Sequence, residues 1–169
     1  MMFEWAALLC LIAAAGLLIA LSVIDLRVRL LPNVLVAPLA LLGIIFHIVT
    51  RWHYLDITSV LLGGLAGFGI LYGVRAVANH IYKMDALGLG DVKLLGAAGL
   101  WLGPEMVMMA LSVGAFAGLL HGIGIALWIS YKTKTKPRFA GLQLPAGPGF
   151  AVGIVAVAIY MFHDFRVWG

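Results

Sequence analysis

Long apolar runs, separated by short polar stretches, make up most of the 169-residue chain. A helix needs about 20 apolar residues to cross a bilayer, and roughly 17–25 are tolerated. Six runs predict six helices, and they cover residues 5–24, 34–50, 57–78, 91–102, 106–130 and 144–162. The fourth run is too short to cross alone unless it is tilted, partly buried, or extended past Gly103 and Pro104.

The composition favours a membrane protein. Hydrophobic residues make up 64% of the chain and charged residues 11%, whereas a soluble domain has about 45–50% and about 25%. The mean hydropathy of +1.11 leaves too little polar surface for a water-soluble enzyme or a nucleic-acid-binding protein. We therefore expect an all-α, polytopic bundle of six transmembrane segments in the lipid bilayer, forming one domain over residues 1–169.

The basic residues predict the orientation, since Lys and Arg accumulate in cytoplasmic loops. Nine of the eleven lie on the side of the connections between runs one and two, three and four, and five and six. They are Arg27, Arg29, Arg75, Lys83, Lys93, Lys132, Lys134, Lys136 and Arg138. Only Arg51 and Arg166 lie on the other side. We expect both termini outside the cytoplasm and the Arg75 side chain extended toward the membrane interface.

Seven acidic residues divide into two groups. Four flank the apolar runs on the outer side and fit solvated helix-end charges: Glu4, Asp56, Glu105 and Asp164. The other three, Asp25, Asp85 and Asp91, fall on the cytoplasmic side. Asp25 follows the first run directly, and Asp91 interrupts an apolar stretch. Ionisable groups at membrane depth are costly, so by default they indicate function.

Two aspartates at matching depth are typical of one kind of hydrolysis. Adjacent carboxylates cannot both ionise easily and so share a proton. One then acts as general base on a water while the other polarises the scissile carbonyl. Gly88 and Gly90 fit this scheme, because glycine permits unusual backbone angles and leaves room for an extended peptide to approach the acid. The residues alone leave another interpretation open: Asp25 caps its helix and pairs with Arg27 or Arg29, and Asp91 is an N-cap paired with Lys93.

No cofactor is expected. The five histidines are scattered along the chain and do not form a metal constellation. Cys10 is the single cysteine, so neither an internal disulfide nor a Cys-x-x-Cys zinc pair can form. No serine or cysteine has a neighbour that would activate it as a nucleophile.

Three blocks of the chain resemble the type IV prepilin peptidase family, the intramembrane aspartic proteases of the Gly-x-Gly-Asp class. The first block is DLRVRLLPN (25–33). The second is DALGLGDVKL (85–94), followed by AG (98–99) and WLG (101–103). The third is PAGP (145–148). The blocks occur in the family's order and extend over the whole chain.

The resemblance implies that Asp25 and Asp91 are the catalytic pair, while Asp85 stands where many members have Glu. Gly88 and Gly90 would belong to the active-site loop, with Pro32, Asn33 and Lys93 as candidate substrate-binding residues. From the residues themselves, Pro32 and Asn33 also fit the start of the second helix, with Asn33 in a local cap or turn. Lys93 would orient the pair, bind the substrate backbone or extend to the interface.

By the same resemblance, the substrates would be type IV prepilins or pseudopilins, cut after a short basic leader and before a hydrophobic helix. The location would be the bacterial inner membrane, with the active site near its cytoplasmic face. Larger members carry paired Cys-x-x-Cys motifs associated with methylation, and none precedes Asp25. We therefore expect a short form without methyltransferase activity, of the kind serving Tad/Flp pili. A preflagellin-type peptidase with the same pair and a small ion- or proton-coupled transporter subunit are the alternatives.

Overall fold

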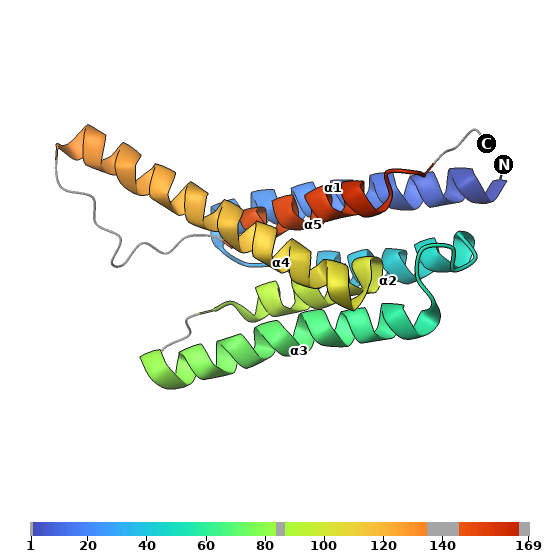
Figure 1. Cartoon of the computed structure of the whole chain (residues 1–169). Helices are drawn as coiled ribbons and strands as arrows, with labels where there is room; N and C mark the ends of the chain where they lie inside the picture. The colour runs from blue at the N-terminus through green and yellow to red at the C-terminus, as the bar shows by residue number, and fades with distance from the viewer. Residues whose placement is uncertain (1, 84–86, 135–145, 166–169) are drawn as a thin grey trace.

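The computed structural model describes residues 2–83, 87–134 and 146–165, and these residues are helical with short connections and no strand. Five helices follow one another along the chain (Figure 1). They are α1 (Met2–Val28), α2 (Asn33–Val49), α3 (Ile57–Tyr82), α4 (Leu89–Thr133) and α5 (Gly147–Met161). The prediction of an all-α protein is thus confirmed for this part of the chain.

Helix α4 contains both the fourth and the fifth predicted run. Its helical backbone is interrupted at Gly103, where φ is 75° and ψ is 176°. Glycine adopts this left-handed φ without steric cost, and Pro104 behind it has no N–H to continue the ladder. Leu95 and Val107, on opposite sides of the break, both contact Gly67 of α3. The helix therefore turns back at Gly103 into two arms, 89–102 and 104–133 (Figure 1).

The lengths of the helices bear on how many cross a membrane. Among the described residues, α1, α3 and α4 are long and apolar enough to do so. Helices α2 and α5 are apolar but shorter, with 17 and 15 residues. The three long helices support a membrane protein, whereas six separate crossings stay a prediction.

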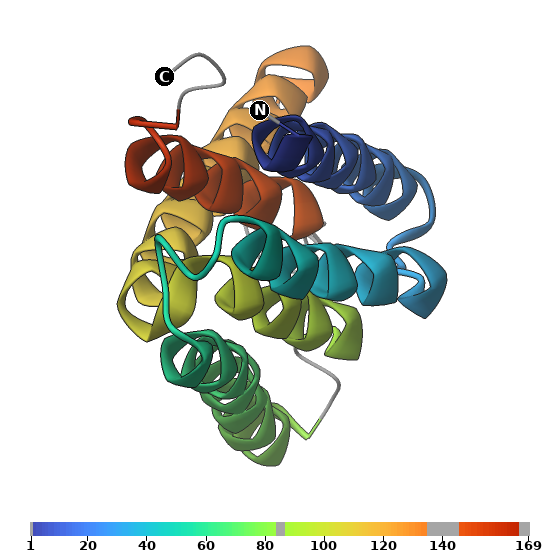
Figure 2. The same ribbon diagram turned by 90° about the vertical axis from the view of Figure 1, so that its right-hand side faces the viewer.

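Glycine contacts bring the helices close together. The two arms of α4 lie between α3 on one side and α2 and α5 on the other, and α1 packs on α2 and α5 (Figure 2). Gly63 of α3 touches the backbone of Gly99, and Gly114 touches that of Gly149 at the start of α5. Small residues at these positions let membrane helices approach closely. By contrast, Gly69 has open space around it, so not every glycine of α3 is used for packing within the chain.

Two hydrogen bonds join α2 to the break in α4. The indole Nε1 of Trp101 donates to the carbonyl oxygen of Leu39 at 2.8 Å. The carbonyl oxygen of Trp101 lies 3.0 Å from Nε2 of the buried His47. Because a carbonyl only accepts, that nitrogen carries the proton. These bonds fix the depth of α2 relative to the turn at Gly103.

Charged residues gather at the ends of the bundle. Helices α1 and α3 end, and α4 both starts and ends, on one side of the molecule (Figure 1). Seven of the nine basic residues predicted to share a side lie there: Arg27, Arg29, Arg75, Lys83, Lys93, Lys132 and Lys134. Lys136 and Arg138 fall outside the described residues. Arg51 lies at the opposite end, 5.2 Å from the centre of the Phe3 ring.

Candidate active site

Asp25 lies in the last turns of α1 and points into the bundle. Its side chain is 5% exposed. Its Oδ2 accepts a hydrogen bond of 2.8 Å from the backbone N–H of Gly147. Gly147 is the first residue of α5, where N–H groups lack partners inside the helix and the helix dipole favours negative charge. A cap of α1 is therefore an incomplete description of Asp25: its carboxylate binds the start of a different helix, and Arg29 is close enough to interact with it electrostatically.

Gly147 leaves no space beside Asp25. A Cβ atom at this position would lie 2.7 Å from Oδ2 and 3.0 Å from Cγ of Asp25. Only glycine lets the start of α5 approach the carboxylate this closely. Our sequence prediction of the site did not include Gly147. The signal available was its position at the start of the last predicted helix, where a free N–H can receive an anion.

Asp91 opens α4, as predicted. It is the third residue after the N-cap Gly88, and the Gly88 N–H bonds back to its carboxylate. An acidic side chain at this position commonly bonds the N–H of the N-cap, as in a capping box. The Asp91 side chain is 8% exposed, and its Oδ1 is buried without a hydrogen-bond partner among the described residues.

Asp25 and Asp91 lie at the same end of the bundle, where the end of α1 meets the starts of α4 and α5. Their carboxyl groups are close enough to interact electrostatically. An unpaired buried carboxylate oxygen is costly, so the free Oδ1 of Asp91 indicates a place for a shared proton, a water or a substrate group. The arrangement brings together the two predicted acids, and their catalytic role stays a prediction.

The two glycines of the motif do not behave as expected. Gly88 has an ordinary extended conformation, with φ −65° and ψ 135°. Among the described glycines, only Gly103 has a positive φ. A Cβ on Gly90 would lie 2.8 Å from Cβ of Leu31, in the connection between α1 and α2. Neither glycine uses the positive φ that the lack of a side chain permits, and the space beside Gly90 is filled by the α1–α2 connection rather than open to a peptide.

The candidate substrate-binding residues lie at the exposed rim of the site. Pro32 is the N-cap of α2 and has no side-chain capping bond. Asn33 does not form a local cap, since its Oδ1 accepts a 3.0 Å hydrogen bond from Nζ of Lys93. Lys93 is thus bonded to the start of α2 rather than paired with Asp91. This bond ties the first motif block to the second at the mouth of the site.

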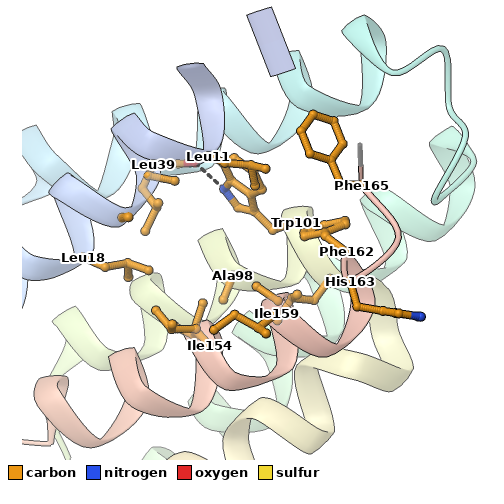
Figure 3. Close-up of a pocket in the computed structure, with 15 residues that line it drawn as sticks. Leu11, Leu18, Leu39, Ala98, Trp101, Ile154, Ile159, Phe162, His163 and Phe165 are labelled. Atoms are coloured by element: carbon orange, nitrogen blue, oxygen red, sulfur yellow. Dashed lines mark hydrogen bonds between the residues drawn. The ribbon is translucent and has the colours of Figure 1, made fainter. Parts of the chain in front are cut away.

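An apolar cavity of about 350 Å³ lies between α1 and α5 (Figure 3). Leu11 and Leu18 line it from α1, Ile154 lines it from α5, and Phe162 lines it from the C-cap that follows α5. Trp101 closes its inner side, with its indole turned toward Leu39 (Figure 3). Leu18 is seven residues before Asp25, so the cavity begins about 10 Å along α1 from the acid.

Other predicted features of the site have separate outcomes. Asp85 and Pro145 fall outside the described residues. No group of three or more His, Cys, Asp or Glu side chains that could hold a metal ion occurs in the described ranges. Cys10 is buried in the core and is not part of the site.

Comparisons with known proteins place the chain in a family. Residues 12–123 match the model of the type IV leader peptidase family. The prepilin leader peptidase/N-methyltransferase of Escherichia coli (strain K12) is 33% identical over 135 residues, covering 80% of this chain and 56% of that protein. The protein of the same name from Burkholderia pseudomallei (strain 1026b) is 31% identical, covering 88% of this chain and 46% of that protein. That from Dickeya chrysanthemi is 36% identical, covering 68% and 40%.

The chain thus spans about half the length of the relatives it matches. No solved structure matches it. The matched region contains Asp25, Gly88, Gly90 and Asp91. The resemblance to this family, which the motif blocks predicted, is thereby confirmed. The chain belongs to the type IV leader peptidase family.

Proposed function

We propose that this protein is an aspartic endopeptidase that removes the leader from type IV prepilins or pseudopilins. The observation that carries the proposal is that two buried carboxyl groups, from α1 and α4, lie within electrostatic reach of each other at one end of an apolar bundle. Family membership and the names of the relatives support the same reaction. The proposal covers the peptidase reaction alone, and pilins of the Tad/Flp type are the first substrates to test.

The proposed reaction needs only the two acids and a water. One carboxylate takes a proton from the water, whose oxygen attacks the carbonyl carbon of the scissile peptide bond. The other acid, protonated, donates a hydrogen bond to the carbonyl oxygen as it gains negative charge. A proton then passes to the nitrogen, the carbon–nitrogen bond breaks, and a carboxyl group and an amine leave. The buried, unpartnered Oδ1 of Asp91 fits a group that shares a proton or holds the water.

The surroundings of the pair suit a substrate that reaches it from the lipid. Asp25 and Asp91 lie where apolar helices of the bundle end. A polypeptide that is cut there must have an apolar segment on the side of the cut that faces the bilayer interior. The cavity between α1 and α5 begins about 10 Å from Asp25 and ends about 21 Å from it, near Leu11. We propose that the hydrophobic helix of the substrate packs here, while its leader lies outside the bundle.

The charge distribution supports the proposed orientation. Seven described basic residues lie at the end of the molecule that carries Asp25 and Asp91. Under the positive-inside rule this end faces the cytoplasm, and the start of α1 and the end of α5 face outward. The proposed location is the bacterial inner membrane. In this arrangement α2, α5 and the two arms of α4 are the remaining crossings, each tilted, or shorter than a full span.

The Lys93–Asn33 pair is proposed to meet the substrate backbone at the mouth of the site. Both side chains are at least partly exposed, and their hydrogen bond is accessible from the end of the bundle. An extended peptide could replace this hydrogen bond. Its carbonyl groups would accept from Nζ of Lys93, and its N–H groups would donate to Oδ1 of Asn33. Pro32 would fix the direction in which α2 leaves the site, because its ring restrains the backbone.

Co-expression with a candidate prepilin tests the proposed activity. We expect the pilin to lose its leader, seen as faster migration on a gel and as a new N-terminus by mass spectrometry. The same cleavage should persist in detergent-solubilised membranes after treatment with a metal chelator. Failure to cleave any prepilin of the host, or loss of cleavage on chelation that added metal restores, would overturn the proposal.

A further inference from the structure

Arg75 is a cation inside an apolar helix, two turns before the end of α3. The sequence predicts a side chain extended toward the membrane interface. Its Nε donates a 2.8 Å hydrogen bond to the backbone carbonyl oxygen of Leu87, in the connection between α3 and α4. The bond is partly buried. An arginine placed at such a depth is expected to have a specific partner, and this carbonyl is one.

The carbonyl that Arg75 holds belongs to the peptide group that also holds Asp91. The Leu87 carbonyl and the Gly88 N–H are the two ends of one peptide bond. Gly88 lies directly against the Asp91 carboxylate, since a Cβ on Gly88 would lie 2.9 Å from Oδ2 of Asp91, and the Gly88 N–H is oriented to donate to that carboxylate. A peptide group is planar, so fixing the direction of its oxygen also fixes the direction of its N–H. Arg75, the peptide and Asp91 therefore form one continuous chain of hydrogen bonds.

The local fold explains why this peptide needs an outside partner. Gly88 is the N-cap of α4, so the carbonyl of Leu87 precedes the hydrogen-bond ladder of the helix. Arg75 supplies a charged donor, and charge-assisted bonds are stronger than neutral ones. A cation at the oxygen end also polarises the peptide and strengthens the bond made by its N–H.

Helix α3 is firmly placed to present Arg75. Its glycines Gly63 and Gly67 pack directly on the backbone of Gly99 and Leu95 in the first arm of α4. The same arm starts at Leu89 and carries Asp91 in its first turn. Arg75 extends this contact from the helix bodies to the connection that leads into the catalytic motif.

We propose that Arg75 is a positioning residue for Asp91, acting through the Leu87–Gly88 peptide. The inference rests on the proposed peptidase function. Arg75 does not touch the reacting atoms in this arrangement; it sets the place and direction of the carboxyl group that does. Its loss should therefore lower the rate of the chemical step and leave substrate binding unchanged.

The test compares Arg75→Gln, Arg75→Lys and Lys132→Gln in purified protein with a prepilin substrate. Lys132→Gln is the control, because it removes one positive charge from the exposed end of α4, where Lys132 lies over the ring of Trp128. We expect Arg75→Gln to lower kcat roughly 10- to 100-fold at unchanged KM, as small misplacements of catalytic groups do. Arg75→Lys should restore part of kcat, since an ammonium donates to a carbonyl but lacks the planar fork. The control should behave as wild type.

Several results would overturn the inference. Wild-type kcat in both Arg75 variants would show that Asp91 needs no such support. A raised KM at unchanged kcat would place Arg75 in substrate binding instead. If Arg75→Gln does not accumulate in membranes, Arg75→Lys is compared with wild type instead. A lower kcat at the wild-type melting temperature supports positioning, whereas a fall in both kcat and the melting temperature contradicts it. Asp91→Asn in the same assay separates the two proposals, because its activity would refute the peptidase mechanism itself.

Discussion

Each candidate catalytic acid is held by a backbone N–H at the start of a helix. Asp25 receives the N–H of Gly147 from α5, and Asp91 receives that of Gly88 from α4. Helix starts offer unpaired donors and a favourable dipole for a carboxylate. The positions of both acids therefore depend on where two helices begin.

Gly147→Ala tests this dependence for Asp25. The new Cβ would lie 2.7 Å from Oδ2, so the carboxylate or the start of α5 must move. We expect the rate of leader removal to fall roughly 10- to 100-fold, because the acid is displaced from its partner. The matched control is Gly16→Ala on α1, where a Cβ meets nothing within 4 Å. Equal activity of the two variants would show that the close approach has no functional role.

The sequence predicted the acids more readily than their partners. Asp25 and Asp91 are conspicuous because each is a charge in an apolar region. The Gly147 contact joins residues 122 positions apart and uses a backbone atom, so no side-chain pattern reports it. Asn33 was predicted as a local cap, but Pro32 takes the N-cap position and leaves the Asn33 side chain to Lys93.

At the scale of helices, the cavity between α1 and α5 is the feature open to a direct test. Ala158 lines it from α5, whereas Ala156 on the same helix is exposed and does not. Filling the cavity with Ala158→Trp should raise KM for a full-length prepilin roughly 10-fold, equivalent to about 1.4 kcal/mol of lost binding. Ala156→Trp should leave KM unchanged. An unaffected KM in both variants would contradict substrate binding in the cavity.

The link between α2 and α4 gives a prediction about stability. Trp101→Phe removes the hydrogen bond to the carbonyl of Leu39 while keeping most of the aromatic packing. Net hydrogen bonds in proteins, including those between membrane helices, contribute about 1 kcal/mol. We expect a loss of that size in the free energy of unfolding in mixed micelles. Trp128→Phe, at an exposed position, is the control, and equal stability of the two variants would contradict the role of the bond.

The apolar runs predicted where the helices lie along the chain, but they did not predict how the fourth and fifth runs are joined. The fourth and fifth runs meet where Gly103 and Pro104 were expected to separate them, and the left-handed φ of Gly103 turns the chain back there. Hydropathy reports which residues avoid water and does not report a turn angle. The 17 residues of α2 agree with its predicted run, whereas α5, with 15 residues, is shorter than the run that predicted it.

For the molecule as a whole, the separation of charge predicts its orientation. In a Cys10→Ser background, we expect His53→Cys, in the connection between α2 and α3, to react with a membrane-impermeant maleimide applied to spheroplasts. Lys132→Cys, at the basic end, should react only after the cells are lysed. Labelling of both positions from outside, or the reverse pattern, would contradict the proposed topology.

The central claim is that Asp25 and Asp91 together perform the hydrolysis. The most direct test is the initial rate of leader removal by wild type, Asp25→Asn and Asp91→Asn, each reconstituted in vesicles at equal amount. Asparagine keeps the size of each side chain but can neither take up nor share a proton. We predict that each single variant loses roughly 10²- to 10⁴-fold or more of the rate while remaining folded in the membrane. Wild-type cleavage by either variant would contradict the account.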